Sequence, residues 1–221
     1  MPTPPDSSGQ DNRRADIIAK ATELFVSKGY AATSMSALAD ACGIQKPSLY
    51  HHFRGKQALV LACVMEGYDV AIERLRKVGN DAKLTHEERF RQAMAENYRT
   101  IVSSPVGRMS PLIAEVSLQF PDVARTFHDR FIMQQHEIMS AIIDGGVAAG
   151  AFVDLDRLGL KHLIFGPIVT LSLSRDMFAS LDTLETHFPV ERIRDSHCDL
   201  LLKLMRAGSA AETAPDRAKE V

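Results

Sequence analysis

Apolar side chains recur every three or four residues along most of this chain, which is the spacing of one buried face of an α-helix. No run alternates as a strand does between hairpin turns, so we expect an all-α protein of about nine helices. The expected helices cover residues 12–28, 35–42, 45–53, 56–78, 85–102, 109–120, 121–149, 154–173 and 189–207.

Several helix ends carry residues that favour starting or stopping a helix. Gly29 follows the first apolar stripe, and glycine tolerates the backbone conformations that end a helix. Thr85 and Glu88 have the spacing of a capping box, in which each side chain bonds the backbone of the other residue. Pro121 is expected to open a long helix that Gly150 ends.

Residues 33–56 give the clearest local prediction, two short helices joined by a tight turn. Ser34 is a good N-cap because its hydroxyl can accept a hydrogen bond from a free amide of the first turn. The apolar positions that follow it are Met35, Leu38, Ala39 and Cys42. Gly43 can take the left-handed conformation that ends this helix and turns the chain sharply, which completes a helix-turn-helix pattern.

The second of these two helices is expected to present a polar face. Pro47 is tolerated in its first turn, where backbone amides lack intrahelical partners. Leu49 and Phe53 lie four residues apart and are expected to face the interior. The side chains left on the other faces are Lys46, Ser48, Tyr50 and His51. The second helix of a helix-turn-helix enters the major groove of DNA, whereas in an ordinary bundle the same face is simply solvated.

The stretch resembles the DNA-binding region of the TetR family of bacterial transcriptional repressors. The residues that carry the resemblance are Thr33, Ser34, Leu38, Ala39, Gly43, Ile44, Lys46, Leu49, Tyr50, His52, Phe53, Lys56 and Leu59. It extends from about Asn12 to Glu66 and departs at Gln45, where the family often has a serine N-cap. The resemblance implies an N-terminal three-helix DNA-binding domain and a C-terminal helical domain that binds a ligand and dimerises.

The pattern and the resemblance together give a set of expected DNA contacts. These are Thr33, Ser34, Gln45, Lys46, Pro47, Ser48, Tyr50, His51 and Lys56. Gln45 and Lys46 lie where they can reach base edges or nearby phosphates, since amides read adenine and lysine reads guanine. Tyr50 and Lys56 are expected to hold phosphates and set the register. His52 suits a packed position as well as it suits a contact.

Charge is distributed unevenly along the chain, whose net charge is −2. Residues 11–56 contain seven basic and four acidic side chains, a net of +3. The first ten residues contribute −1, so the remainder carries −4. A mildly basic N-terminal region on an acidic body suits a protein that touches DNA with one end only.

The sequence divides into four expected segments. They are a disordered arm over residues 1–11, a DNA-binding domain over 12–56, a ligand-binding and dimerisation domain over 57–207, and a disordered tail over 208–221. The helix at 56–78 connects the two domains. The polar, proline-rich N-terminus is unlike a signal peptide, and the apolar runs are shorter than a membrane span. These features predict a cytoplasmic protein.

Two further expectations concern the C-terminal domain. Its last two helices are unusually apolar, and the resemblance implies that they pair with their copies in a homodimer; the alternative is burial against their own domain. The resemblance also implies a small-molecule effector pocket. The candidate lining residues are Tyr98, Met109, Phe120, Phe127, Phe131, Met133, His136, Phe165 and Met177. The alternative is that these side chains belong to an ordinary hydrophobic core, where phenylalanine and methionine are more often found. Few charges accompany them, so we expect a hydrophobic or aromatic effector.

Other chemistry has less support in the sequence. The three cysteines, Cys42, Cys63 and Cys198, fit no zinc motif and are expected to be small buried hydrophobic residues rather than redox groups. One helix carries His128, Asp129, His136 and Glu137, but metal ligands that face one ion usually lie three or four residues apart. We expect no metal and no cofactor.

Catalytic motifs are also missing from the sequence, which contains neither a glycine-rich phosphate loop nor a nucleophile elbow. With the helix-turn-helix pattern, the resemblance to the TetR family implies a homodimeric repressor that a small effector releases from a palindromic DNA operator. The alternative is a helical-bundle enzyme or small-molecule-binding protein with no role at DNA.

Overall fold

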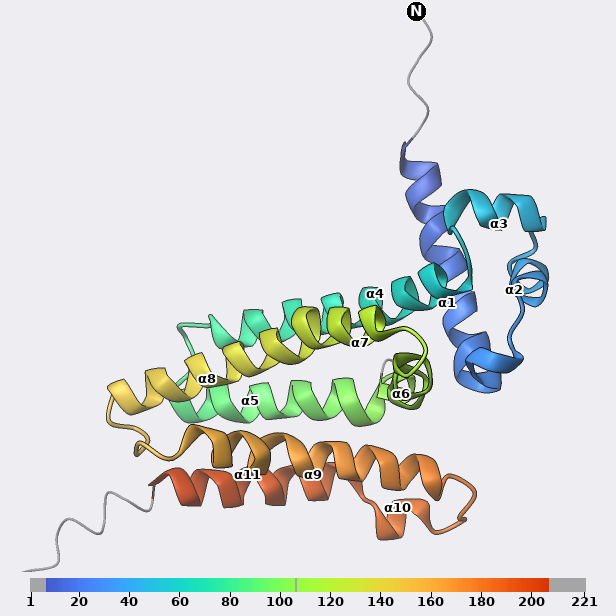
Figure 1. Cartoon of the computed structure of the whole chain (residues 1–221). Coiled ribbons are helices and arrows are strands. Elements are labelled where there is room, and N and C mark those ends of the chain that lie inside the picture. The colour runs from blue at the N-terminus through green and yellow to red at the C-terminus, as the bar shows by residue number, and fades with distance from the viewer. Residues whose placement is uncertain (1–6, 106, 207–221) are drawn as a thin grey trace, which may run out of the picture. The chain divides into compact units, whose positions relative to one another are not determined.

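The computed structural model describes residues 7–105 and 107–206, and the regular elements within these ranges are all helices (Figure 1). In chain order they are α1 (Ser7–Ala32), α2 (Met35–Cys42), α3 (Lys46–His52), α4 (Lys56–Gly79), α5 (His86–Tyr98), the π-helix η1 (Arg99–Ser103), the 3-10 turn η2 (Gly107–Met109), α6 (Ser110–Ser117), α7 (Pro121–Phe127), the π-helix η3 (His128–Ile132), α8 (Met133–Ala148), α9 (Arg157–Met177), α10 (Leu184–His187) and α11 (Val190–Arg206). The prediction of an all-α chain is confirmed.

The described residues form two compact units. Unit 1 comprises residues 7–70 and 108–132, and unit 2 comprises 71–105, 107 and 133–206. Helix α4 contributes to both units. This grouping differs from the expected division at residues 56 and 57, because the segment 108–132 packs with the N-terminal helices rather than with the C-terminal body.

Long-range contacts explain why this segment belongs to unit 1. The carboxylate of Glu115 in α6 accepts the backbone N–H groups of Tyr30 and Ala31 at the end of α1, each at 3.1 Å. The rings of Phe127 and Phe131 lie against Tyr68 of α4, with centroid distances of 5.0 and 4.1 Å. Contacts between residues so far apart in sequence leave no periodic signal from which a boundary could be predicted.

The interior of unit 1 contains the apolar stripes that the pattern predicts. Its most deeply buried side chains include Ile17, Ala21, Phe25, Leu38, Leu49, Leu59 and Val64. Helix α1 is interrupted at Gly29, whose φ of 77° and ψ of 169° are non-helical. This is the break that the sequence predicts, since a side chain at such a positive φ would be strained.

Unit 2 is a bundle in which α5 packs against α8 and α11, and α9 packs against α11 and η1 (Figure 1). Its core contains Leu75, Phe90, Met94, Tyr98, Met139, Ile142, Ile164, Ile168, Leu201 and Met205. The predicted capping box of α5 is present, because Thr85 and Glu88 each accept a bond from the other residue's backbone. Asp156 caps α9 by accepting the Gly159 N–H at 2.6 Å.

Two of the helices contain π-helical turns that the sequence pattern does not reveal. Segment η1 follows α5 directly, and η3 lies between α7 and α8, so the long helix expected over 121–149 has three segments. Near η1 the hydroxyl of Ser172 donates to the Ile101 carbonyl at 2.9 Å. A side chain thereby supplies a hydrogen bond to the altered backbone of the π-turn.

Other boundaries differ modestly from expectation. Helix α1 begins at Ser7, so residues 7–11 are helical instead of belonging to a disordered arm. The connector expected over 181–187 contains the short helix α10. Gly150 ends α8 with a φ of 71°, as predicted. The remaining arm residues 1–6 and the tail 208–221 lie outside the described residues.

Candidate nucleic-acid interface and effector region

The helix-turn-helix of unit 1 forms as its sequence predicts. The Ala37 N–H donates to the Ser34 hydroxyl at 3.1 Å, which caps the start of α2. Gly43 takes the left-handed conformation, with φ 64° and ψ 37°, and its N–H closes the end of α2. At the start of α3, Gln45 occupies the N-cap position without a side-chain bond, as expected for a residue that caps poorly.

Helix α3 separates a buried face from a polar exposed face. Leu49 is completely buried and Phe53, just after the helix, is 4% exposed. The exposed residues of the turn and helix are Gln45, Lys46, Pro47, Ser48, Tyr50 and His51. His52 is half-buried, and its ring lies 5.7 Å from that of His51. Six of the nine predicted contacts therefore lie on α3 or at its N-cap, a geometry that fits insertion into a major groove.

Thr33 and Lys56 have internal partners instead of facing outward. Thr33 is 1% exposed, and its hydroxyl donates to the Gly29 carbonyl at 2.7 Å. The Lys56 ammonium donates to the carbonyls of Tyr30 at 2.8 Å and Thr33 at 2.9 Å, and it lies 4.1 Å from the centroid of the Tyr30 ring. These polar groups join the end of α1 to the start of α4, and the expectation that both residues contact DNA stays a prediction.

The expected effector-pocket residues do not form one site. Met109, Phe120, Phe127 and Phe131 lie in unit 1, whereas Tyr98, Met133, His136, Phe165 and Met177 lie in unit 2. Met109 is buried, the ring of Phe120 packs edge-on against Tyr30, and Met177 is 75% exposed. His136 and Phe165 line a common cavity of about 20 Å³, which has room for about one water molecule.

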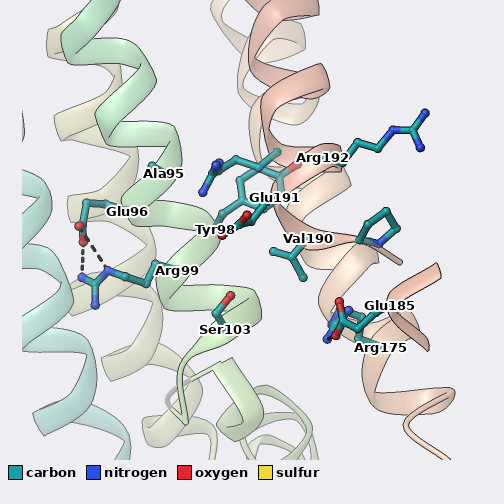
Figure 2. A pocket seen from close by; sticks show the side chains of 12 residues that line it. Ala95, Glu96, Tyr98, Arg99, Ser103, Arg175, Glu185, Val190, Glu191 and Arg192 are labelled. Atoms are coloured by element: carbon teal, nitrogen blue, oxygen red, sulfur yellow. Dashed lines mark hydrogen bonds and ion pairs between the residues drawn. The ribbon is translucent and has the colours of Figure 1, made fainter. Parts of the chain in front are cut away.

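A larger pocket of about 750 Å³ lies in unit 2, between the end of α5, the end of α9, α10 and the start of α11 (Figure 2). We call it the arginine pocket, after Arg99, Arg175, Arg192 and Arg194 in its lining. Of the expected residues only Tyr98 lines it. Its lining also includes Glu96, Glu185 and Glu191, so this pocket differs from the expected effector site, which has few charges.

A polar chain connects α5, α11 and α9 beside this pocket. The Tyr98 hydroxyl lies 2.8 Å from Nδ1 of His197, and Nε2 of His197 lies 2.9 Å from the Leu163 carbonyl. A carbonyl oxygen can only accept a hydrogen bond, so Nε2 of His197 is the donor to Leu163. In the neutral imidazole Nδ1 then accepts the hydrogen bond that the Tyr98 hydroxyl donates. Burial lowers the pKa of His197 and raises the pKa of Tyr98 to about 12, which favours the neutral pair.

Helices α9 and α11 together leave an apolar face uncovered in this chain. The exposed side chains are Leu158, Leu163, Val169, Leu173 and Met177 of α9, with Leu200 and Leu204 of α11. A monomeric protein rarely leaves so many large apolar side chains in contact with water on two neighbouring helices. The opposite faces of the same helices are buried in unit 2, so the alternative of burial against their own domain accounts for only one side of each helix.

Several individual groups lie outside any sequence motif, and others lie as predicted. Glu115 and the four pocket arginines had no motif to mark them, because their partners come from other elements. The three cysteines are free and buried, as predicted. Within residues 7–105 and 107–206, no helix is long and apolar enough to cross a membrane.

Comparisons with known proteins support the interpretation of the N-terminal region. The sequence profile of "Bacterial regulatory proteins, tetR family" matches residues 17–63. The repressor KstR2 of Rhodococcus jostii is 28% identical over 156 residues, which cover 68% of this chain and 74% of that protein. The activator FasR of Mycolicibacterium smegmatis is 38% identical over 68 residues, 31% of each chain, so this second likeness spans only about a third of FasR.

Solved structures resemble nearly the whole chain. A TetR/AcrR-family regulator from Thermobifida fusca is 26% identical with a TM-score of 0.61, and the match covers 86% of this chain and 97% of that one. FadR of Bacillus subtilis in complex with stearoyl-CoA is 18% identical with a TM-score of 0.66, covering 85% and 97%. AibR in complex with isovaleryl coenzyme A and operator DNA is 20% identical with a TM-score of 0.67, covering 86% and 98%.

The fold, the capped helix-turn-helix and the sequence likenesses agree. The polar face of α3 is exposed while its apolar face is buried, the family profile matches this same region, and similar structures cover most of the chain. Residues 17–63 of this chain thus match the tetR family of bacterial regulatory proteins, and the chain as a whole shares its fold with solved TetR-family regulators.

Proposed function

We propose that this regulator is a homodimeric repressor that binds a palindromic DNA operator through α3 of each copy. The exposed row of Gln45, Lys46, Ser48, Tyr50 and His51 carries this proposal, because it offers an amide, a cation and hydroxyls on one accessible helix. Amide and lysine side chains discriminate bases in the major groove. Tyr50 is placed to hold a phosphate, which fixes register without reading sequence.

Dimerisation is proposed from the apolar face of α9 and α11. One helix-turn-helix covers only a few base pairs, and paired heads that bind successive major grooves gain affinity and specificity. Two-fold symmetry between the copies then requires a palindromic operator. A double variant, Leu200→Glu with Leu204→Glu, is expected to sediment as a monomer, whereas Lys203→Glu, at an exposed position of the same helix, should stay dimeric. A monomeric wild-type protein would contradict this part of the proposal.

A small molecule is proposed to release the repressor. An effector changes DNA affinity only if it binds the two conformations of the protein unequally. The expected effector has a hydrophobic part. The bound ligands of FadR and AibR, stearoyl-CoA and isovaleryl coenzyme A, make acyl thioesters of coenzyme A the first candidates to test here. KstR2 is a repressor and FasR an activator, so the sign of the response needs direct measurement. A cytoplasmic location follows from the proposed chromosomal target.

A nuclease footprint on the DNA flanking the protein's own gene tests the proposal. We expect a protected palindrome whose protection is lost when the effector is added. The affinity should fall with salt, with a log–log slope of about −0.9 for each phosphate neutralised. Tyr50→Ala should weaken protection, and a change at the exposed Ser36 of α2, such as Ser36→Ala, serves as the matched control. Binding without salt dependence would contradict phosphate-held recognition.

A further inference from the structure

The first half of α1 lies against the end of α3 in unit 1 (Figure 1). The guanidinium group of Arg14, on α1, lies over the ring of Phe53, 5.1 Å from its centroid. Phe53 is the C-cap residue of α3, and Arg54 follows it directly. We propose that Arg14 and Arg54 bind phosphates of the DNA backbone beside the major groove that α3 enters. This inference rests on the proposed function, to which it adds two backbone contacts, one of them from α1.

Helix α1 carries Arg14 to the edge of the unit. Ile17 and Ile18 follow Arg14 by three and four residues and are buried, so the three side chains share one face of the helix. Arg14 itself is exposed, because it lies one turn beyond the part of this face that the core covers. Its guanidinium group therefore lies beside the end of α3 and is accessible to a ligand.

Basic side chains exceed acidic ones along this edge. The described side chains of α1 up to Lys20 include three cations and one carboxylate. The carboxylate, that of Asp16, lies 3.6 Å from Arg13 and 3.5 Å from Lys20, so two of the cations share it. Among the described side chains, neither Arg14 nor Arg54 has an ion-pair partner. Both guanidinium groups stay protonated and keep donors for an anion.

Phe53 holds the side chain of Arg14 in place. A cation over the face of an aromatic ring is attracted to the ring, and the core fixes this ring, since Phe53 is buried. The attraction uses the charge of the guanidinium and none of its N–H donors. Those donors can form paired, charge-assisted hydrogen bonds with a phosphate. A guanidinium that is already held loses less freedom when the phosphate binds.

The length of α3 places both arginines near the DNA backbone. Its 7 residues span about 10 Å at about 1.5 Å per residue, and the major groove is about 12 Å wide. The N-terminal residues of the second helix in a helix-turn-helix contact base edges. Groups beyond its other end are then close to a wall of the groove, where the phosphates lie. Arg54 continues the chain at that end and Arg14 reaches it from α1, so both contacts would position α3 without reading sequence.

Fluorescence-anisotropy titrations of the full chain over a salt series test the inference, with a labelled duplex of random sequence and a duplex that carries the footprinted operator. Arg14→Gln and Arg54→Gln should each flatten the log–log slope by about 0.9, which at about 0.1 M salt weakens binding by about 8-fold. The factor should be the same for both duplexes, because every sequence has the same phosphates. Arg14→Lys keeps the charge and should keep the slope. Arg125→Gln removes an exposed arginine of α7 in the same unit and should leave slope and affinity unchanged.

Three results would overturn the inference: Arg14→Gln or Arg54→Gln keeps the wild-type slope, Arg125→Gln or Arg14→Lys flattens it as much as they do, or their loss of affinity differs between the two duplexes. A lower unfolding midpoint of Arg14→Gln with a wild-type slope would leave Arg14 only the role of covering Phe53. The proposed function fails in a different way. Wild-type binding without salt dependence refutes DNA recognition by α3, whereas a wild-type slope that both glutamine variants retain refutes only these two contacts.

Discussion

Replacing Lys56 by methionine tests whether this lysine stabilises the DNA-binding unit from within. The ammonium donates to the carbonyls of Tyr30 and Thr33 at 2.8 and 2.9 Å. A hydrogen bond that involves a charged group contributes about 1.5–3 kcal/mol. Because Lys56 is half-buried and water can partly replace it, we take the lower end of this range for each bond. Methionine keeps most of the apolar stem, so Lys56→Met should lose about 3 kcal/mol.

Thermal unfolding followed by circular dichroism measures this loss. In a chain of this size about 1 kcal/mol shifts the midpoint by about 2–4 °C, so we expect the transition of the Lys56→Met protein about 6–12 °C lower. Lys46→Met is the matched control, because Lys46 is exposed on α3 and has no partner among the described residues. It should leave the midpoint unchanged.

DNA binding separates this internal role from a phosphate contact. If Lys56 is internal, Lys56→Met measured below its unfolding temperature should keep the wild-type salt slope. Loss of a phosphate contact would flatten the slope by about 0.9. An unchanged unfolding midpoint together with a flattened slope would refute our reasoning and restore Lys56 as a phosphate ligand.

Three more predictions concern other parts of the molecule. Leu49→Ala, at a completely buried position, should lower the free energy of unfolding in urea by about 2–5 kcal/mol. Tyr50→Ala should keep wild-type stability and lose DNA affinity. Equal stability of the two variants would show that α3 is oriented differently. Glu115→Ala removes the acceptor of two backbone N–H groups and should lower the free energy of unfolding by about 1–2 kcal/mol. A loss no larger than that of Glu23→Ala on α1 would rule out this role. Burial lowers the pKa of His197 in the folded chain. As pH falls below about 6.5, the unfolded chain therefore protonates this histidine before the folded chain does, and the free energy of unfolding should fall from pH 7.5 to 5.5. His197→Gln should reduce that fall, whereas His162→Gln, at an exposed position, should not.

The sequence predicts the helix-turn-helix well because its determinants are local. Ser34 and Gly43 act on backbone groups within a few residues of themselves, and Leu49 is buried by the same periodicity that exposes Tyr50. Such interactions leave a direct signal in residue order. The capping box at Thr85 forms for the same reason.

Features that depend on distant partners could not be predicted in this way. Lys56 reads as an exposed cation in sequence, and only the fold brings the carbonyls of Tyr30 and Thr33 to its ammonium. The arginine pocket depends on residues from 99 to 194 whose spacing has no pattern. Aromatic and methionine side chains attract attention as pocket residues, yet the same types fill ordinary cores, and most of those expected here are packed or dispersed over both units.

Selection from a pool of random double-stranded DNA by the purified full-length protein tests the central claim most directly, because it requires no knowledge of the operator's location. Our account predicts enrichment of an inverted repeat whose half-sites are spaced for successive major grooves, and loss of enrichment with Tyr50→Ala. If the wild-type protein at low salt enriches no sequence, with and without the candidate effectors, the claim that α3 reads DNA is contradicted.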